Sequence, residues 1–147
     1  MIGADRVGVR LSPTSPANNA EDSDPRSTFT YAVEHMNRYG LAYIHVIEGA
    51  TRTSREGDKG FDAHELRDVF KGGYIGNNRY DLELAEERVE RGEVDAVAFG
   101  RPFIANPDLV ERLKRGLPMA EPDQSTFYGG DAHGYTDYPT HDADEAA

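Results

Sequence analysis

Cysteine is absent from this chain of 147 residues, which excludes disulfides, thiolate catalysis and cysteine-ligated metals. No apolar run approaches the roughly 20 residues of a membrane helix, and the segment from Met1 to Val9 lacks the anatomy of a signal peptide. Basic residues are outnumbered: 16 Lys and Arg stand against 27 Asp and Glu, for a formal net charge of −11. Such a chain would repel nucleic acid and anionic lipid. We therefore expect a cytoplasmic protein with no nucleic-acid or membrane partner.

Several chemical motifs are also lacking. The sequence contains no nucleophile elbow and no P-loop. Its five histidines show no HExxH or His-x-His spacing, so we predict no metal site. We expect His35 and His64 at the surface of helices and His45 packed within a strand.

Short apolar runs alternate with amphipathic stretches, which is typical of βα units on a parallel sheet. The predicted strands are residues 6–11, 41–47, 74–76 and 96–99. Helices are expected to begin near Pro25, Asp62, Leu82 and Asn106 and to end near Gly40, Phe70, Gly92 and Gly116. Four βα units fit either a small doubly wound sheet or half of a (β/α)8 barrel, and the pattern alone does not separate them.

Two strand ends carry residues suited to an anion. Gly100 and Arg101 follow the fourth strand, and Asn77 and Asn78 follow the third. Phosphate sites in barrels often form from the loops after the last two strands. Glycine lets backbone N–H groups approach an anion, and arginine supplies a bidentate fork. The alternative is that Gly100 makes a tight turn and Arg101 is a solvated charge.

Four blocks of sequence make a more specific pattern together than any of them does alone. In chain order they are Val7–Pro13, Gly76–Asp81, Asp95–Leu109 and Phe127–Pro139. They resemble the last four βα units of the old yellow enzyme family (NADH:flavin oxidoreductase / ene-reductase), in that family's order and spacing. The resemblance runs from about Arg6 to Pro139.

This resemblance implies a (β/α)8 TIM barrel with FMN at its C-terminal face. Arg10 matches an arginine beside N1 and O2 of the flavin, where negative charge gathers on reduction, and its strand parity points it into a barrel. The alternative for Arg10 is a salt bridge inside the barrel. Gly100 and Arg101 match the grip on the FMN phosphate.

The remaining matched positions are at the third loop and the C-terminal end. Asn77, Asn78 and Arg79 would also contact the cofactor, although the family usually has glycine at position 78 or 79. Asn tolerates the left-handed conformation and would substitute, whereas Arg79 would either add charge to the phosphate site or obstruct it. Tyr128 matches an aromatic on the substrate side, with Phe127 beside it. The alternative for both is plain C-terminal packing.

The implied function is FMN-dependent reduction of activated alkenes, nitro compounds or quinones by NAD(P)H. The family's first four βα units, with the substrate-binding His pair and the proton-donor Tyr, would precede Arg6. We therefore predict no catalytic residue in this chain, an inactive lone chain, and a partner that is either an N-terminal half or a second copy. The expected domain spans residues 1–140, followed by a frayed acidic tail, 141–147. Alternatives are a non-catalytic half-barrel that binds phosphate or flavin, and a different phosphate-binding barrel enzyme.

Overall fold

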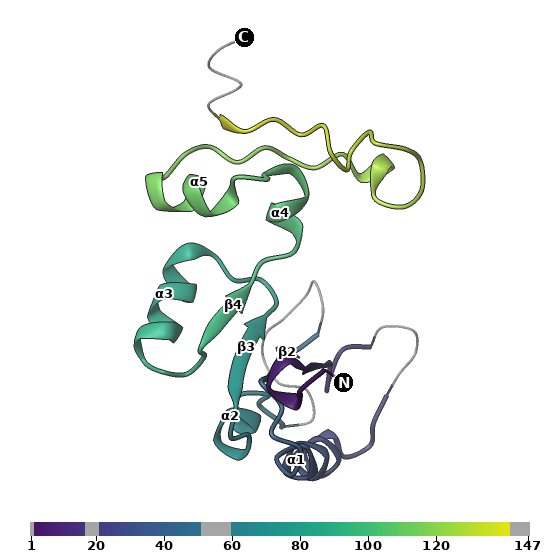
Figure 1. Cartoon of the computed structure of the whole chain (residues 1–147), viewed down its shortest axis with the longest axis vertical. Coiled ribbons are helices and arrows are strands. Elements are labelled where there is room, and N and C mark those ends of the chain that lie inside the picture. Colours follow the sequence, from purple (N-terminus) through teal and green to yellow (C-terminus); the bar gives the residue numbers. More distant parts are fainter. Residues whose placement is uncertain (1, 17–20, 51–59, 142–147) are drawn as a thin grey trace. The chain divides into compact units, whose positions relative to one another are not determined.

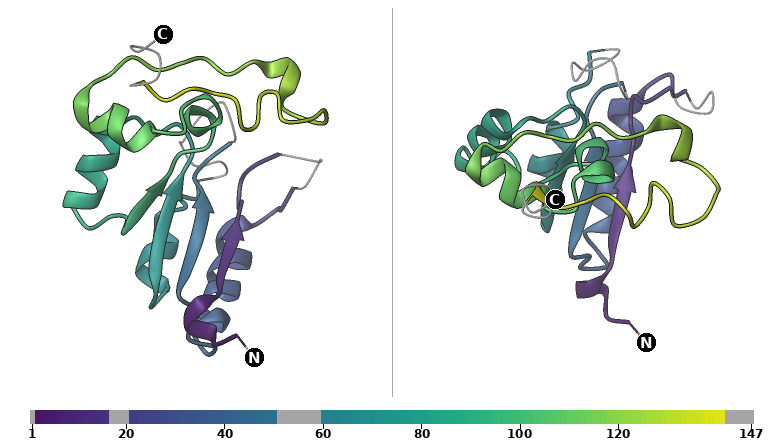
Figure 2. Two further views of the ribbon diagram at one scale, coloured as in Figure 1. Left: turned by 45° about the horizontal axis from the view of Figure 1, so that its top comes forward. Right: turned by 90° about the horizontal axis from the view of Figure 1, so that it is seen from above.

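A computed structural model describes residues 2–16, 21–50 and 60–141. The chain divides into two compact units, Met1–Ala98 and Phe99–Ala147. The described part of the first unit contains a parallel sheet of four strands in the order β1-β2-β3-β4. Figure 1 and Figure 2 show helices alongside this sheet. The four strands that the sequence predicts are thereby confirmed.

The elements alternate along the first unit as the sequence predicts. They are β1 (Gly8–Leu11), α1 (Pro25–Met36), β2 (Tyr43–Ile47), α2 (Glu65–Val69), β3 (Gly73–Asn77), α3 (Leu82–Glu90) and β4 (Ala96–Ala98). The second unit contains α4 (Arg101–Ala105), α5 (Leu109–Arg115) and a 3₁₀ turn at Gln124–Thr126. The extent of the predicted domain, 1–140, stays a prediction.

Side-chain caps fix where two helices begin. The Asp24 carboxylate accepts the N–H of Ser27 at 3.1 Å, and proline occupies the next position, as the start of an α-helix favours. The Asp81 carboxylate accepts the N–H of Leu84 at 2.9 Å. Both predicted helix starts are confirmed.

One face of the sheet supports the apolar core. The burial of β2 alternates along the strand, with Ile44 and Val46 fully buried, because successive side chains point to opposite faces. Val33 of α1 and Leu66 of α2 pack against them, with Tyr74 of β3 completing the layer. Phe29 and Met36 of α1 pack against the same core, so one side of this helix faces it.

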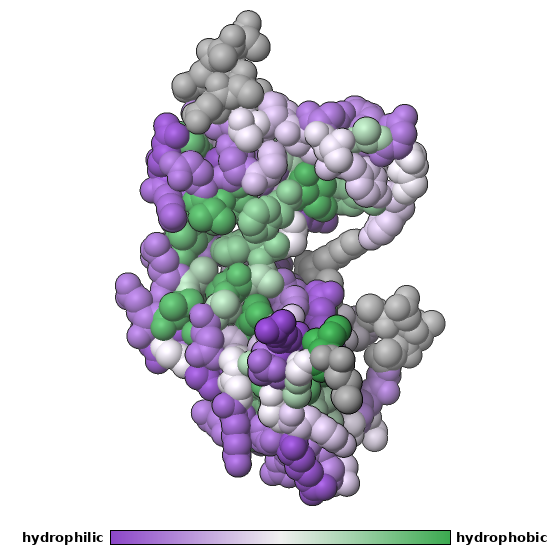
Figure 3. Space-filling model, in the orientation of Figure 1, coloured by the Kyte–Doolittle hydropathy of each residue, from purple (hydrophilic) through white to green (hydrophobic). Residues whose placement is uncertain are grey.

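The opposite face of the sheet remains partly exposed. Arg10, His45 and Ile75 are register partners across β1, β2 and β3; Arg10 is exposed and the other two are half-buried. Tyr43, on the same face, is 39% exposed, and its ring lies where a Cβ on Gly8 would be. Figure 3 shows apolar surface over the position that β4 occupies in Figure 1. The first unit is thus a layered sheet with an open second face.

Some local predictions were wrong. The helix expected from Asp62 is confined to α2 because Asp62 accepts the N–H of His64 at 3.0 Å and forms a turn first. Helix α4 was not predicted, and α5 begins at Leu109 rather than Asn106.

The last described residue of the chain, His141, is hydrogen-bonded to α5's N-terminal cap residue, Asp108. The N–H of His141 donates to Asp108 at 2.8 Å; the rest of the predicted tail, 142–147, lies outside the described residues. In the described ranges no helix combines the length and apolar character needed to cross a membrane.

Candidate cofactor site

The carboxyl ends of three strands are joined by one pair of side chains. Arg10, near the end of β1, donates from its guanidinium to Oδ1 of Asn77 at 3.3 Å. The Asn77 amide in turn donates to the carbonyl of Ala98 at 2.7 Å, at the end of β4. Parallel strands end at the same edge of a sheet, so β1, β3 and β4 present these groups together. The structure brings together Arg10 and Asn77, two of the residues predicted to bind the cofactor.

Arg10 keeps most of its donors available. Its side chain is exposed and forms no ion pair with any described residue. The salt bridge that was the alternative for Arg10 is therefore not seen in the described ranges. A guanidinium carries five N–H donors, so an anion at this edge would find several of them.

The loop after β3 adopts backbone conformations that favour glycine. Asn78 has φ of 110° and Arg79 has φ of 52°, so both lie in the left-handed region. This confirms that Asn78 takes the conformation that glycine would provide. The Asn78 side chain is buried and donates to the carbonyl of Glu48 at 2.6 Å and of Ala50 at 3.2 Å. Its amide group is thus directed into the protein, while Arg79 is exposed.

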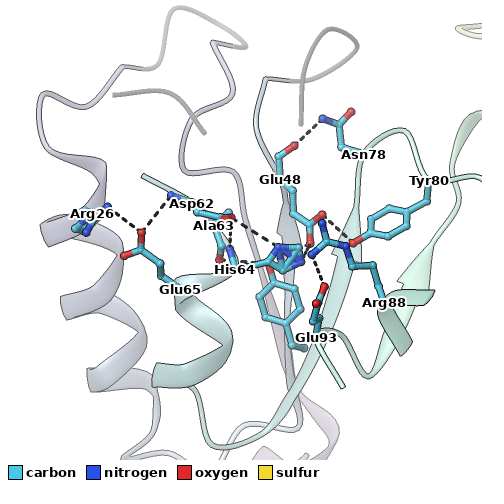
Figure 4. Close-up of polar contacts among 11 residues, drawn as sticks. Arg26, Glu48, Asp62, Ala63, His64, Glu65, Asn78, Tyr80, Arg88 and Glu93 are labelled. Atoms are coloured by element: carbon cyan, nitrogen blue, oxygen red, sulfur yellow. Dashed lines mark hydrogen bonds and ion pairs between the residues drawn. The ribbon is translucent and has the colours of Figure 1, made fainter. Parts of the chain in front are cut away.

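A buried carboxylate lies directly behind this loop. Glu48, immediately after β2, is 2% exposed. Its side chain accepts a hydrogen bond from Tyr80 at 2.8 Å, as Figure 4 shows. It accepts a second from Tyr74 at 3.3 Å. Burial and, next, the adjacent Glu48 carboxylate raise the pKa of Tyr74 well above its usual value, so this phenol stays protonated and keeps donating.

His64 belongs to the same cluster. Its Nε2 lies 3.2 Å from Glu48 Oε1, and its side chain is only 19% exposed, so the predicted surface position is wrong. The contact is close but is not aligned as a hydrogen bond. One feature of the sequence could have indicated the cluster: a carboxylate, Glu48, directly follows an apolar strand.

His45 lies beside Arg10 on the open face of the sheet. Its Nε2 is buried and has no hydrogen-bond partner among the described residues. Burial, and secondarily the positive charge of Arg10, lower the pKa of His45. The expectation that His45 packs within a strand is confirmed, but one of its nitrogens is left without a partner.

Gly100 and Arg101 begin the second unit. Gly100 is the N-terminal cap residue of α4 and is exposed, and a Cβ built on it would meet no atom within 4 Å in the part of the chain described. Its carbonyl accepts the N–H of Phe103 at 3.0 Å, so it does form a turn. The Arg101 side chain is exposed. Both backbone and side chain are accessible to an anion, and their role in binding phosphate stays a prediction.

The two predicted aromatic residues lie further along the second unit. Tyr128 is 89% exposed. Phe127 is half-buried, and its carbonyl accepts a hydrogen bond from Tyr135 at 3.0 Å. Their predicted substrate-side role remains untested. Over the described ranges, no group of three or more His, Asp or Glu side chains is arranged to hold a metal ion.

Comparison with known proteins identifies relatives of this arrangement. The model of the NADH:flavin oxidoreductase / NADH oxidase family matches residues 1–120. The chain is 41% identical to 12-oxophytodienoate reductase 2 of Arabidopsis thaliana over 143 residues, covering 95% of this chain and 38% of that protein.

Solved structures agree. The old yellow enzyme from Trypanosoma cruzi aligns with a TM-score of 0.85 and 40% identity, over 95% of this chain and 36% of that one. Morphinone reductase in complex with tetrahydroNAD aligns with a TM-score of 0.81 and 46% identity, over 94% of this chain and 36% of that one. The chain therefore spans less than two fifths of the length of these relatives, and its four parallel βα units correspond to half of their TIM barrel. Family model, relatives and fold agree that the chain belongs to the NADH:flavin oxidoreductase / NADH oxidase family.

Proposed function

We propose that this chain is the cofactor-binding portion of an FMN-dependent oxidoreductase that reduces activated alkenes, nitro compounds or quinones with NAD(P)H. The observation that carries the proposal is the Arg10–Asn77 pair at the carboxyl edge of the sheet, with the exposed guanidinium on the open face. Bound FMN would supply hydride transfer, accepting from the nicotinamide and donating to the substrate.

The residues present are suited to this cofactor. Arg10 would place positive charge against the flavin ring, where charge builds up during reduction. Gly100 would offer its unobstructed backbone to the phosphate, and Arg101 would add a charged fork. The unpaired Nε2 of His45, next to Arg10, marks a polar position on the same face that calls for a further partner.

The names of the relatives support the reaction class. Two are reductases by name, 12-oxophytodienoate reductase and morphinone reductase, and the latter was solved with tetrahydroNAD. A third, from Leishmania infantum, is named a probable flavin mononucleotide-dependent alkene reductase. A nicotinamide donor and an alkene acceptor are therefore the first pair to test on this chain.

The test is retention of FMN. We expect the purified protein, with its partner where one exists, to be yellow and to release FMN on denaturation. Fluorescence titration should show that Arg101→Ala weakens FMN binding at least about tenfold, since a hydrogen bond to a charged group contributes roughly 1.5–3 kcal/mol. Arg115→Ala, on the exposed part of α5, is the matched control. Equal affinities for Arg101→Ala and the control would remove Arg101 from the site.

A second candidate is a non-catalytic half-barrel that binds flavin or phosphate, favoured by the 38% share of the curated relative that the chain covers. We propose that the open sheet face and the edges of β1 and β4 are covered by an N-terminal half-barrel or by a second copy, since exposed strand edges favour association. Light scattering on the lone chain, followed by co-expression with the N-terminal half of a relative, tests this.

Turnover separates the two candidates. General acid catalysis contributes about 10²–10⁴-fold. If the co-expressed N-terminal half supplies the proton donor, the complex should turn over cyclohexenone at least that much faster than the lone chain. Turnover by the lone chain that equals the complex would exclude the non-catalytic candidate.

A further inference from the structure

Glu48 contacts three successive parts of the loop after β3. Its backbone N–H donates to the carbonyl of Asn77 at 3.0 Å. Its own carbonyl accepts from the Asn78 side chain at 2.6 Å. Its carboxylate accepts from the Tyr80 hydroxyl at 2.8 Å. One residue at the end of β2 thus contacts both ends of the segment 77–80, which contains three of the predicted cofactor-binding residues.

Burying the Glu48 carboxylate costs free energy, so its contacts must offset that cost. A carboxylate buried to 2% exposure loses its hydration and is tolerated only with hydrogen-bonding or charged partners. An apolar side chain of similar size would fill the space without that cost. The loop it contacts is itself strained, because Asn78 and Arg79 both hold positive φ, and such conformations persist only where surrounding contacts fix them.

The absence of a side chain at Gly76 leaves space for the contact between Tyr80 and Glu48. A Cβ on Gly76 would lie 2.7 Å from the Tyr80 hydroxyl and 2.9 Å from Glu48 Oε1, both closer than real Cβ contacts allow. Any larger residue at position 76 would push the hydroxyl and the carboxylate apart. Glycine in the middle of β3, where it weakens a strand, is thereby explained by the Tyr80–Glu48 hydrogen bond.

We propose that Glu48 is a positioning residue for the loop 77–80: by contacting Asn77, Asn78 and Tyr80 at once, it holds the loop in the conformation that meets the cofactor. The loop's contact with FMN rests on the proposed function; the fixing of the loop by Glu48 does not. Glu48 itself is buried, at 2% exposure, so it would act through the loop.

The first test is hydrogen exchange without any cofactor. In Glu48→Gln, which keeps the size but not the charge, amide exchange at residues 77–80 should accelerate at least about tenfold, while Ile44 and Val46 of β2 keep their protection. Tyr80→Phe and Gly76→Ala should accelerate the same amides, since each removes or displaces the same hydrogen bond. Glu87→Gln, an exposed carboxylate paired with Arg91 at 2.6 Å, is the matched control and should change neither group of amides.

The second test is FMN affinity in the protein as purified, with its partner where one exists. Glu48→Gln should weaken FMN binding about tenfold, and Glu87→Gln should leave it unchanged. Unchanged exchange at 77–80, or acceleration that is equal in β2 and the loop, overturns the proposal, because the second result describes a residue that only stabilises the core. If the wild-type protein binds no FMN, the proposed function fails, and the exchange data still decide the role of Glu48.

Discussion

Each of the two units is stabilised internally by a different kind of interaction. The first unit has an apolar core in which Ile44, Val46 and Leu66 are fully buried between a sheet and its helices. In the second unit two polar side chains, Asn106 and Arg112, are buried and bind backbone groups far along the chain. Where short helices cannot bury a large apolar area, hydrogen bonds from polar side chains fix the path of the chain instead.

The polar contacts of the second unit converge on connecting segments. Arg112 donates to the Asp108 carboxylate at 2.7 Å and to the carbonyl of Pro118 at 2.6 Å. Asn106 both donates to Ala120, at 3.0 Å, and accepts from it, at 2.8 Å. The hydrogen bond from the N–H of His141 and then the one from Arg112 lower the pKa of Asp108, so the acceptor stays charged. These contacts link α5 to the chain that follows it.

The largest effect is expected from Arg112→Met. Removing the buried Arg112 takes a charged donor from Asp108, which keeps only the N–H of His141, and takes the donor from the Pro118 carbonyl. Breaking a buried pair in this way costs roughly 3–5 kcal/mol. Hydrogen exchange should show the loss across 99–141, with the core strands of the first unit still protected. Arg115→Met is the matched control, since the ion pair of Arg115 with Glu111 is exposed and 3.8 Å long. Equal effects of the two variants would contradict the contrast between the units.

The complementary change is Leu66→Ala in the first unit. It removes apolar volume from a position with no exposure and should cost about 2–5 kcal/mol. Urea unfolding measures the loss, and exchange should place it in β2 and β3 rather than in the second unit. Val89→Ala on α3, where Val89 is 45% exposed, should cost far less. A loss from Leu66→Ala spread evenly over both units would show that they unfold as one.

The features that the sequence predicts are mostly those of the first unit, where local patterns determine the structure. The strands and the start of α1 follow from local sequence patterns, and the side of β1 on which Arg10 lies follows from strand parity, so these were predicted correctly. The contacts of Asn106 with Ala120 and of Glu48 with Asn78 and Tyr80 join residues distant in sequence, so no local pattern predicts them. The Asp108–Arg112 pair, by contrast, has the i,i+4 spacing of a helix. Helix α4 has only five residues, too few to show a period. The open backbone at Gly100 was predictable from residue type, whereas the partners of Asn78 were not.

A smaller and opposite effect is expected from Arg79→Gly. Arg79 has φ of 52°, a conformation that costs an L-residue roughly 1–2 kcal/mol and glycine almost nothing. The variant should therefore stabilise the first unit by about 1 kcal/mol in thermal unfolding. Arg91→Gly is the control: Arg91 has φ of −78° at the end of α3, so glycine there should destabilise. Destabilisation by Arg79→Gly would mean that contacts of the Arg79 side chain outweigh its backbone strain.

The smallest effect is a difference in pH dependence, which follows from one histidine in each unit. A hydrogen bond to Asp137, and next its charge, raise the pKa of His133, while burial and then Arg10 lower the pKa of His45. The folded second unit thus binds a proton more readily than its unfolded state does. The stability that His133 contributes is fully present below its unfolded pKa of about 6.5 and is lost as pH rises through the raised folded value. For His45 the folded state resists protonation, so stability is lost as pH falls below about 6.5 towards the lowered folded value.

NMR titration of the two imidazoles should give midpoints on opposite sides of the unfolded value of about 6.5. Exchange measured between pH 5 and 8 should show protection of 99–141 falling as pH rises, and protection of β2 falling as pH drops. His133→Gln and His45→Gln should each flatten only the slope of their own unit. Slopes of the same sign in both units would contradict the assignment. Covering the open face with a partner should bury His45 further and shift its midpoint lower still, unless the partner supplies an acceptor to its free Nε2, in which case the midpoint rises.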